Sequence, residues 1–341
     1  MPEAWLAELG ADPRPWLLDP GHPAVRHLAL RLLEDRPPDD PDVVRARAAA
    51  MGVPPIAPIL DAQDDAGWWV KPGPGYAPKY TGTTWSLIVL EQLGADPSSA
   101  RIQAACAYLL DHTRTTSGGF GCSGSHRDDR LPPPSSVLHC LNGNLVRTLI
   151  AFGHLDDPRV AAAIEWGARA AGGGPDVPTW YASGTSGPGF RCGVNEGLPC
   201  AWGAVKTLRA FAAIPLHHRT PAVELAIEVG VDLLLGVDPA TAAYPAGWDG
   251  RISGSWFRLG FPSGYIADVL QVAEVAVELG RARDPRLQGV LRLVLAKADG
   301  DGRWRNEQPY RGKLWADVDA PGTPSPWVTL RACRVLRAAL G

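Results

Sequence analysis

The chain stops and restarts helices at the same kind of corner several times. Apolar residues at helical spacing end at Gly94, Gly153 and Gly280, and each stop is followed within a few residues by Asp-Pro. Glycine readily adopts the left-handed conformation that ends a helix, aspartate caps the next helix, and proline fits its first turn. Pro215, followed by Thr220-Pro221, is a variant of this corner. Successive corners lie about sixty residues apart, so the sequence predicts a repeated pair of helices.

Each predicted pair has one tight corner and one long connection rich in glycine, proline and tryptophan. The long connections cover residues 114–138, 173–199, 238–261 and 299–324. One helix is expected to begin near Thr83, ahead of the first of these connections. Helices are also expected to begin where the four connections end, near His139, Cys200, Phe261 and Pro326. The first helix of each pair carries a charged face and is predicted to lie outside, whereas the second is more apolar and is predicted to lie inside.

Two architectures bury such pairs, an open solenoid and a closed ring. Solenoids of the HEAT or armadillo type have shorter repeats of about 40 to 47 residues, so the longer period favours the ring. The predicted fold class is therefore all-α, an α/α toroid of five to six outer–inner helix pairs around a central cavity. Residues 1–341 form one domain in this prediction, and residues 1–40 are an N-terminal helical extension that closes the ring.

A short motif connects the repeat to a known family. The segment QDDAGWW at Gln63–Trp69 matches the Q-x-x-x-G-x-W motif of squalene cyclases, and weaker echoes lie at 117–121 and 299–304. From about residue 40 to residue 340 the chain resembles the prenyltransferase and squalene-cyclase repeat family. The resemblance implies an α/α toroid with a central apolar cavity lined by the inner helices. It does not by itself imply a reaction.

The long connections and the N-termini of inner helices should share one face of such a toroid. Residues there line the mouth of the cavity, where ligands bind in this kind of scaffold. Aromatic and amide side chains at these positions are predicted to contact the substrate, and they are Tyr80, Trp85, Asn142, Trp202, Tyr265 and Trp327.

The six cysteines fall into two groups. Cys106 and Cys333 sit among apolar residues in predicted helices, and we expect them to pack in the core. The other four belong to two successive repeats on the predicted cavity face. Two of them open inner helices in the same Cys-x-x-Gly register and two lie in long connections; the four are Cys122, Cys140, Cys192 and Cys200.

Three interpretations of these four cysteines stay open. Thiolates from neighbouring loops and helix starts are suitable ligands for one tetrahedral Zn²⁺, with His126 as a spare ligand. Alternatively, one thiol is catalytic without a metal, favoured by a helix N-terminus that stabilises the thiolate. The third interpretation is unreactive buried cysteine. Gly193 and Gly197 should let the chain fold back and bring Cys192 beside Cys200.

Candidate acids and bases also lie on the predicted cavity face. The text DVDA, which contains Asp317 and Asp319, lacks the last acid of the D-x-D-D motif with which squalene-type cyclases protonate their substrate. These two residues are candidates for general acid–base catalysis, the alternative being solvated loop acids. Asp268 is expected inside an apolar inner helix, either lining the cavity or buried and hydrogen-bonded. Lys206, alternatively an inter-helix ion pair, and His139, alternatively a metal ligand, complete the catalytic candidates.

Charge and hydropathy exclude several classes of partner. The net charge is −3, only five residues are lysine, and no basic run exists, so nucleic acid is not an expected partner. No apolar stretch approaches the ~20 residues that span a bilayer, and the first residues lack the basic region of a secretory signal. We therefore expect a cytoplasmic protein without stable membrane insertion.

The sequence favours an enzyme that acts on a hydrophobic small molecule, isoprenoid-like or polycyclic, in the central cavity. In this hypothesis a thiolate-bound zinc assists hydrolase or lyase chemistry. One alternative is a metal-free Cys/Asp lyase or isomerase similar to linalool dehydratase-isomerase. Another is a non-catalytic scaffold that binds a lipid or a peptide.

Overall fold

The protein is mostly helical in its computed structural model, which describes residues 3–122, 131–173, 185–247 and 250–341. The α-helices are α1 (Ala4–Leu9), α2 (Arg14–Leu17), α3 (Pro23–Leu32), α4 (Pro41–Met51), α5 (Ile56–Asp61), α6 (Thr83–Gln92), α7 (Ala100–Thr113), α8 (His139–Ala151), α9 (Pro158–Gly172), α10 (Ala201–Ala212), α11 (Pro221–Leu235), α12 (Val269–Glu278), α13 (Gln288–Leu295) and α14 (Pro326–Leu340). One antiparallel pair of short strands, β1 (Ser186–Gly187) and β2 (Arg191–Cys192), lies between α9 and α10. The all-α class predicted from the sequence is confirmed.

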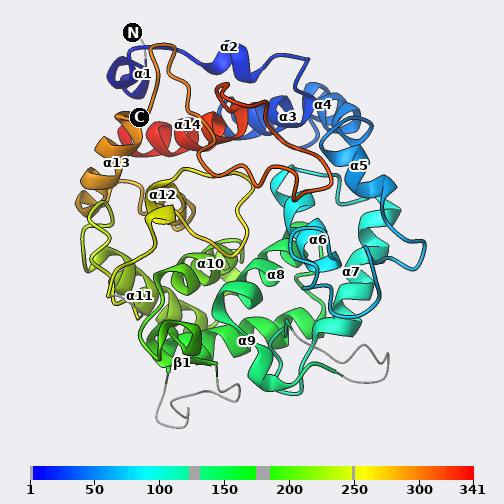
Figure 1. Cartoon of the computed structure of the whole chain (residues 1–341). Helices are drawn as coiled ribbons and strands as arrows, with labels where there is room; N and C mark the ends of the chain where they lie inside the picture. The colour runs from blue at the N-terminus through cyan, green and yellow to red at the C-terminus, as the bar shows by residue number, and fades with distance from the viewer. Residues whose placement is uncertain (1–2, 123–130, 174–184, 248–249) are drawn as a thin grey trace.

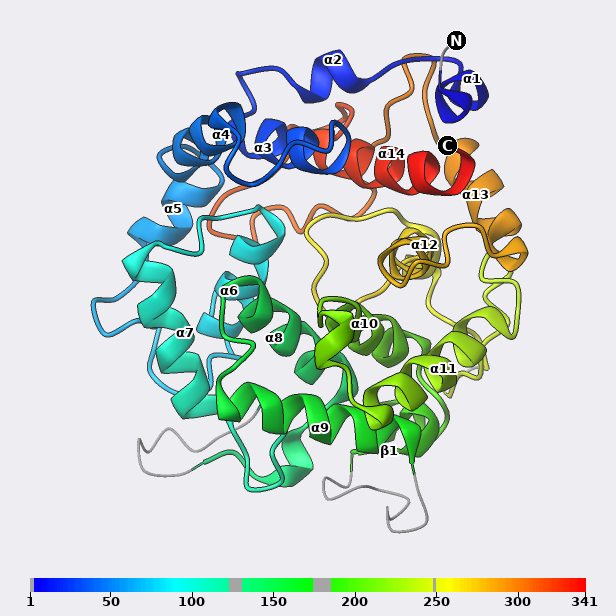
Figure 2. The same cartoon turned by 180° about the vertical axis from the view of Figure 1, so that it is seen from behind.

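The helices form an inner and an outer set (Figure 1). Helices α6, α8, α10, α12 and α14 contact one another in chain order, and α14 also packs against α3. Contacts from α3 to α4, α4 to α5 and α5 to α6 lead back to the first of them. Helices α7, α9, α11 and α13 lie outside this set, each against an inner helix or an outer neighbour, as the view from behind also shows (Figure 2).

The glycine stops have the predicted conformation, but the predicted cap is found on an α-helix only after Gly153. After Gly94, α7 begins only at Ala100, so Asp96 does not cap it, and after Gly280, Asp284 caps the short 3₁₀ helix η6 (Pro285–Leu287). Gly94, Gly153 and Gly280 have φ values of 70°, 90° and 72°, which is the left-handed region that glycine tolerates. At the start of α9, the Asp157 carboxylate accepts a hydrogen bond from the main-chain N–H of Arg159. Each such cap satisfies a helix N–H group that has no partner inside the helix.

Most predicted helix starts agree with the structure, and one is wrong. Helices begin at Thr83, His139 and Pro326, and Cys200 is the residue immediately before α10. The helix expected near Phe261 begins only at Val269. Residues 261–268 contain Pro262 and Gly264, which do not favour a helix, and the first strong N-cap after them is Asp268.

Helices α8 and α10 run parallel and approach very closely at Gly143. A Cβ atom on Gly143 would lie 2.6 Å from the carbonyl carbon of Lys206. Near the helix starts, a Cβ atom on Gly203 would lie 3.1 Å from the Cβ of His139, and in the middle of α10 the Thr207 hydroxyl donates to the His139 carbonyl oxygen at 3.2 Å. The glycine of the Cys-x-x-Gly register is therefore a packing requirement, since any side chain would separate the two main chains.

Gly143→Ala is expected to lower the free energy of unfolding by roughly 1–3 kcal/mol, because the added methyl group overpacks the contact. Gly300→Ala is the matched control, since a Cβ there would meet no atom within 4 Å. Urea unfolding of the two variants measures the difference. Equal stability of both would show that α8 and α10 are free to move apart.

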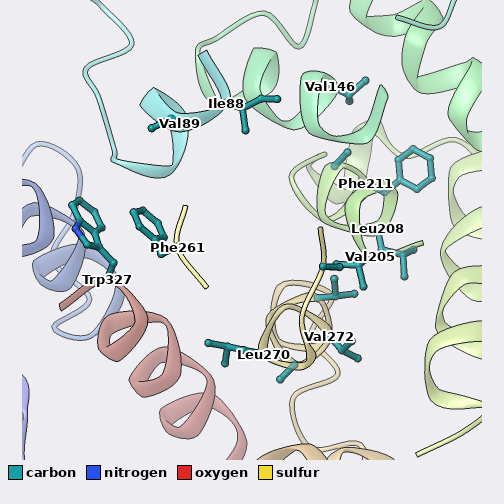
Figure 3. Close-up of a cluster of buried hydrophobic side chains, with 14 of the residues drawn as sticks. Ile88, Val89, Val146, Val205, Leu208, Phe211, Phe261, Leu270, Val272 and Trp327 are labelled. Atoms are coloured by element: carbon teal, nitrogen blue, oxygen red, sulfur yellow. The ribbon is translucent and has the colours of Figure 1, made fainter. Parts of the chain in front are cut away.

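Most of the apolar core is one connected cluster that extends from Trp5 to Leu336, and two small clusters around Val43 and Trp166 lie apart from it. Figure 3 shows part of it, with side chains of the inner helices such as Ile88, Val146, Leu208 and Phe211. Full burial of each such side chain contributes on the order of 1.5–3 kcal/mol. At the N-terminal side, α1, α2 and α3 all contact α14.

Ion pairs fill the space between the C-terminal halves of the inner helices. Arg147 on α8 binds Glu91 on α6 at 3.2 Å and Glu278 on α12 at 2.9 Å. Arg334 on α14 binds the same Glu278 at 3.0 Å. Because α8 and α12 are not neighbours in the succession, these pairs cross the middle of the inner set. The expectation of an apolar central cavity is therefore wrong near the C-terminal halves of the inner helices, where these charged side chains lie.

Acid is expected to destabilise the protein through these carboxylates. Burial raises the pKa of Glu278, but the charges of Arg147, Arg209 and Arg334 outweigh it and hold the pKa at about 2, below the ordinary 4.5. A carboxyl with a lowered folded pKa contributes stability above its unfolded pKa, and that stability is lost as the pH falls towards the folded pKa. The free energy of unfolding should thus decrease between about pH 5 and about pH 2.

Urea titrations across this range measure the effect. The Glu278→Gln variant, which cannot gain a proton there, should show a shallower dependence on pH than the wild type. An unchanged slope in the variant would contradict the assignment of the acid sensitivity to Glu278.

Candidate functional site

A tight hairpin places Cys192 and Cys200 side by side. The main-chain N–H of Cys192 donates to the carbonyl of Leu198 at 3.1 Å, and that of Cys200 donates to the carbonyl of Phe190 at 2.9 Å. The intervening chain turns through the 3₁₀ helix η3 (Gly193–Asn195) and through Gly197, whose φ is 79°. The predicted return of the chain at these glycines is confirmed.

The two thiols interact as a pair. The Cys200 thiol lowers the pKa of Cys192 despite burial, and main-chain N–H groups of Val194 and Asn195 act in the same direction. The same interaction, together with burial, raises the pKa of Cys200, whose sulfur also accepts from the Gly203 N–H at 3.4 Å. These opposite shifts favour Cys192 as the site of the first ionisation, with the proton kept on Cys200.

Cys140 and Cys122 lie around this pair. Cys140 opens α8 and is close enough to Cys192 for their charges to interact, and burial raises its pKa to about 12. The Cys122 thiol donates to the carbonyl of Ser136 at 3.2 Å. Both thiols are near the hydroxyl of Tyr76, whose pKa burial raises. The structure thus pairs Cys192 with Cys200 and leaves Cys140 and Cys122 in their surroundings, and among the described residues no three of these sulfur atoms are arranged to hold a metal ion.

Aromatic rings from several segments form a continuous wall beside the thiols. The Trp85 ring on α6 lies 5.2 Å from that of Tyr76, 5.7 Å from that of Tyr80 and 6.1 Å from that of Tyr265, between ring centroids. Trp202 on α10 lies 6.2 Å from Tyr265. Four of the predicted substrate-binding residues, Tyr80, Trp85, Trp202 and Tyr265, are therefore neighbours.

Two residues of the wall, Tyr76 and Tyr310, are not among the substrate-binding residues predicted from the sequence. Tyr76 precedes α6 and accepts a hydrogen bond from the Trp85 indole N–H at 2.7 Å through its carbonyl oxygen. Tyr310 lies 4.8 Å from Tyr80 between ring centroids. Both stand in long connections, where many aromatic residues occur, so no local pattern distinguishes them.

The other two predicted substrate-binding residues, Asn142 and Trp327, make their contacts with the scaffold instead of the wall. Asn142 accepts from the Phe120 N–H at 2.9 Å and donates to the Ala163 carbonyl at 3.0 Å. Its amide thereby holds two main-chain segments together. Trp327 is buried and stacks on Phe261 at 4.7 Å with the rings almost parallel.

Two catalytic candidates belong to the scaffold. Asp268 is the N-cap of α12 rather than a residue inside a helix, and its carboxylate accepts from Gln271 N–H at 3.0 Å and from Gly260 N–H at 3.2 Å. His139 packs between the rings of Trp166 and Phe190, and burial lowers its pKa to about 4. At neutral pH it is therefore an uncharged core residue.

The two candidate acids before α14, Asp317 and Asp319, differ in their exposure to solvent. Asp317 is exposed and accepts from the Gly312 N–H at 3.0 Å, so it is a solvated loop acid. Asp319 accepts from Asn306 at 2.7 Å and from Ser325 at 2.9 Å. Burial raises its pKa, and these two hydrogen bonds partly offset the effect. Both hold the connection that leads into α14.

Lys206 is the most unusual of the candidates. Its side chain is buried, and its ammonium donates to the Gln271 side-chain oxygen at 2.6 Å. Burial and the charge of Arg209 lower its pKa to about 7. Perturbation of this size by desolvation and a specific neighbour is typical of functional sites. The charge of Lys206 interacts with Cys140 on one side and with Arg209 and Arg331 on the other, so Lys206 lies between the thiols and the ion pairs of the inner helices.

The donor geometry does not match the predicted zinc site. Among residues 3–122, 131–173, 185–247 and 250–341, no group of three or more His, Cys, Asp or Glu side chains is arranged to hold a metal ion. The spare ligand His126 lies outside the described residues. The zinc stays a prediction.

No helix within the described ranges is long and apolar enough to cross a membrane.

Comparisons with known proteins add little to this picture. No family model and no curated protein matches the chain. A crystal structure of a protein from Actinoplanes is similar over 86% of this chain and 98% of its own, with a TM-score of 0.31 and 12% sequence identity. This similarity is too weak to support an argument about fold or function.

Proposed function

We propose that the chain is an α/α toroid enzyme, a metal-free lyase or isomerase that acts on a hydrophobic small molecule. The reacting groups are the thiolate of Cys192 and the thiol of Cys200. The succession of helix contacts that returns to α6 supports the toroid. The substrate sits at the ends of the inner helices where the thiols lie, because ion pairs occupy the opposite ends.

The observation that carries the proposal is the hairpin that holds Cys192 and Cys200 side by side, beside the aromatic wall. A thiol and a thiolate held together are an acid and a base at one place. Two main-chain N–H groups stabilise the anion, so the pair exists without a metal ion. The rings of Trp85, Trp202 and Tyr265 supply a wall for an apolar substrate.

The pair performs an elimination in one balanced step. The Cys192 thiolate takes a proton from a carbon atom of the substrate, the electrons of that C–H bond form a C=C bond, and the bond to the oxygen leaving group on the adjacent carbon breaks. The Cys200 thiol gives its proton to the leaving oxygen. The proton now on Cys192 then passes to Cys200 along their hydrogen bond, which restores the starting state.

A panel of isoprenoid and polycyclic alcohols tests the activity, with the alkene products measured by gas chromatography and mass spectrometry. Cys192→Ser and Cys200→Ala should each abolish product formation, and Cys106→Ser, which alters a buried core cysteine, should not. Binding of panel members without turnover in the wild type would favour the non-catalytic scaffold instead.

Elemental analysis of the purified protein separates this proposal from the zinc-assisted enzyme. The metal-free pair predicts less than about 0.1 zinc per chain in active protein. About one zinc per chain, lost in Cys200→Ala, would replace the proposal with the thiolate site expected from the sequence.

A further inference from the structure

The aromatic wall already holds a positive charge. The Lys79 ammonium lies 4.7 Å from the centroid of the Tyr265 ring and 5.8 Å from that of Tyr76. The Lys313 ammonium lies 5.9 Å from the centroid of Tyr80. Aromatic faces attract cations at such distances because their π electrons carry partial negative charge.

The rings that receive these charges are held in place. The Tyr80 ring packs between those of Trp85 and Tyr310, at 5.7 and 4.8 Å, and the Tyr265 ring lies 6.2 Å from that of Trp202. Tyr80 has a φ of 74°, a conformation that costs a non-glycine residue on the order of 1 kcal/mol. Strain of this kind persists where the surroundings fix a residue, and it is frequent at ligand sites.

We infer that the wall formed by Tyr76, Tyr80, Trp85 and Tyr265 binds an organic ammonium group of the substrate, at the place where the Lys79 ammonium now lies. The inference rests on the proposed function, because it takes this wall as the substrate wall. It narrows the substrate class from any hydrophobic small molecule to a lipophilic organic cation.

Lys79 is suited to mark such a place and then to leave it. The residue is exposed, and no ion pair that holds its ammonium is present among the described residues. Its charge rests on the two ring faces, which stabilise an exposed cation only weakly. An ammonium bearing methyl groups or other carbon substituents is poorly hydrated and gains more from the same faces, so it displaces the lysine.

The neighbouring thiols suit a cationic ligand. Cys140 and Cys122 are close to Tyr76, and Cys140 is close enough to Cys192 for their charges to interact. In the proposed complex the ammonium on the wall directs its positive charge towards this group of thiols, and the carbon chain attached to it extends over Trp85 and Trp202. The ring faces thereby orient the substrate towards Cys192.

Binding of choline, compared with its neutral isostere 3,3-dimethyl-1-butanol, tests the inference by tryptophan fluorescence titration. Choline should bind at least about tenfold more tightly than the alcohol. Lys79→Gln should strengthen choline binding several-fold, whereas Lys79→Arg, which keeps a cation in place, should not. Tyr265→Leu should remove the preference and Tyr265→Phe should retain it.

Equal affinity for choline and the alcohol, or no choline binding to Lys79→Gln, would overturn the inference. Alkylation of Cys192 by iodoacetamide, measured on the same samples, reports on the thiol pair separately. Loss of the choline preference with normal alkylation contradicts only the ligand class. Slow alkylation with a normal choline preference contradicts the proposed function and leaves the cation site intact.

Discussion

Arg147→Met is expected to lower the free energy of unfolding by about 3–5 kcal/mol, since it leaves buried carboxylates without their main partner. Arg147 binds Glu91 at 3.2 Å and Glu278 at 2.9 Å, and it also donates to the carbonyl of Arg209 at 2.9 Å. Arg334 at 3.0 Å and Arg209 at 3.9 Å then remain close to Glu278. Methionine keeps most of the volume of the side chain, so the loss reports on charge rather than on packing.

Arg159→Met is the matched control. Arg159 binds Asp157 at 2.7 Å and Asp111 at 2.6 Å, but this pairing lies at the surface, where ion pairs contribute about 0–1 kcal/mol. Urea unfolding of both variants at neutral pH gives the comparison. Losses of equal size would show that the ion pairs between the inner helices are as well hydrated as surface pairs.

Lys206→Met is expected to change stability in the opposite direction and to raise the free energy of unfolding by roughly 1–3 kcal/mol at neutral pH. Burial lowers the pKa of Lys206 to about 7 from 10.5, so the folded protein carries the cost of a desolvated amine. The lost hydrogen bond to Gln271 offsets part of the gain, because it leaves a buried oxygen without a donor.

The gain should depend on pH with a definite sign. Between about pH 7 and about pH 10.5 the unfolded lysine binds the proton more tightly than the folded one, so wild-type stability rises with pH relative to the variant. The advantage of Lys206→Met is therefore largest near pH 6 and shrinks towards about pH 10. Lys71→Met, in a loop, controls for the loss of a lysine. A variant less stable than the wild type at pH 6 would contradict this account of Lys206.

The corners and the helices were predictable because their signals are local. Gly153, Asp157 and Pro158 set the end of α8 and the start of α9 through main-chain conformation and one cap, and neither depends on distant residues. Asp268 was misplaced for a related reason. Its sequence neighbours suggest a helix, but its role as a cap depends on the extended chain before it.

The charged interior was not predictable from the pattern of single helices. Arg147, Glu274 and Arg331 lie on helices whose other residues are mostly apolar, although α12 also carries Glu278 and α14 also carries Arg334 and Arg337. Their partners are supplied by other helices, as in the pairing of Arg331 with Glu274 at 2.7 Å. The pairing of Cys192 with Cys200 was predictable, because Gly193 and Gly197 let the chain return between them, whereas the expected convergence of the cysteines on one metal-binding point is not seen among the described residues. Which of them is primed for ionisation depends on the hydrogen bonds around Cys192, and these appear only in the folded hairpin.

The central claim is that Cys192 is a thiolate base stabilised by the thiol of Cys200. Limited alkylation with iodoacetamide near pH 7, followed by intact-mass measurement and peptide mapping, tests it most directly. The account predicts one fast label per chain, at Cys192, and labelling at least about tenfold slower in Cys200→Ala, because loss of the donor returns the pKa of Cys192 towards its ordinary value. Buried Cys106 should remain unlabelled, since burial raises its pKa to about 12. Labelling spread evenly over Cys122, Cys140 and Cys192, or a rate unchanged in Cys200→Ala, would contradict the account.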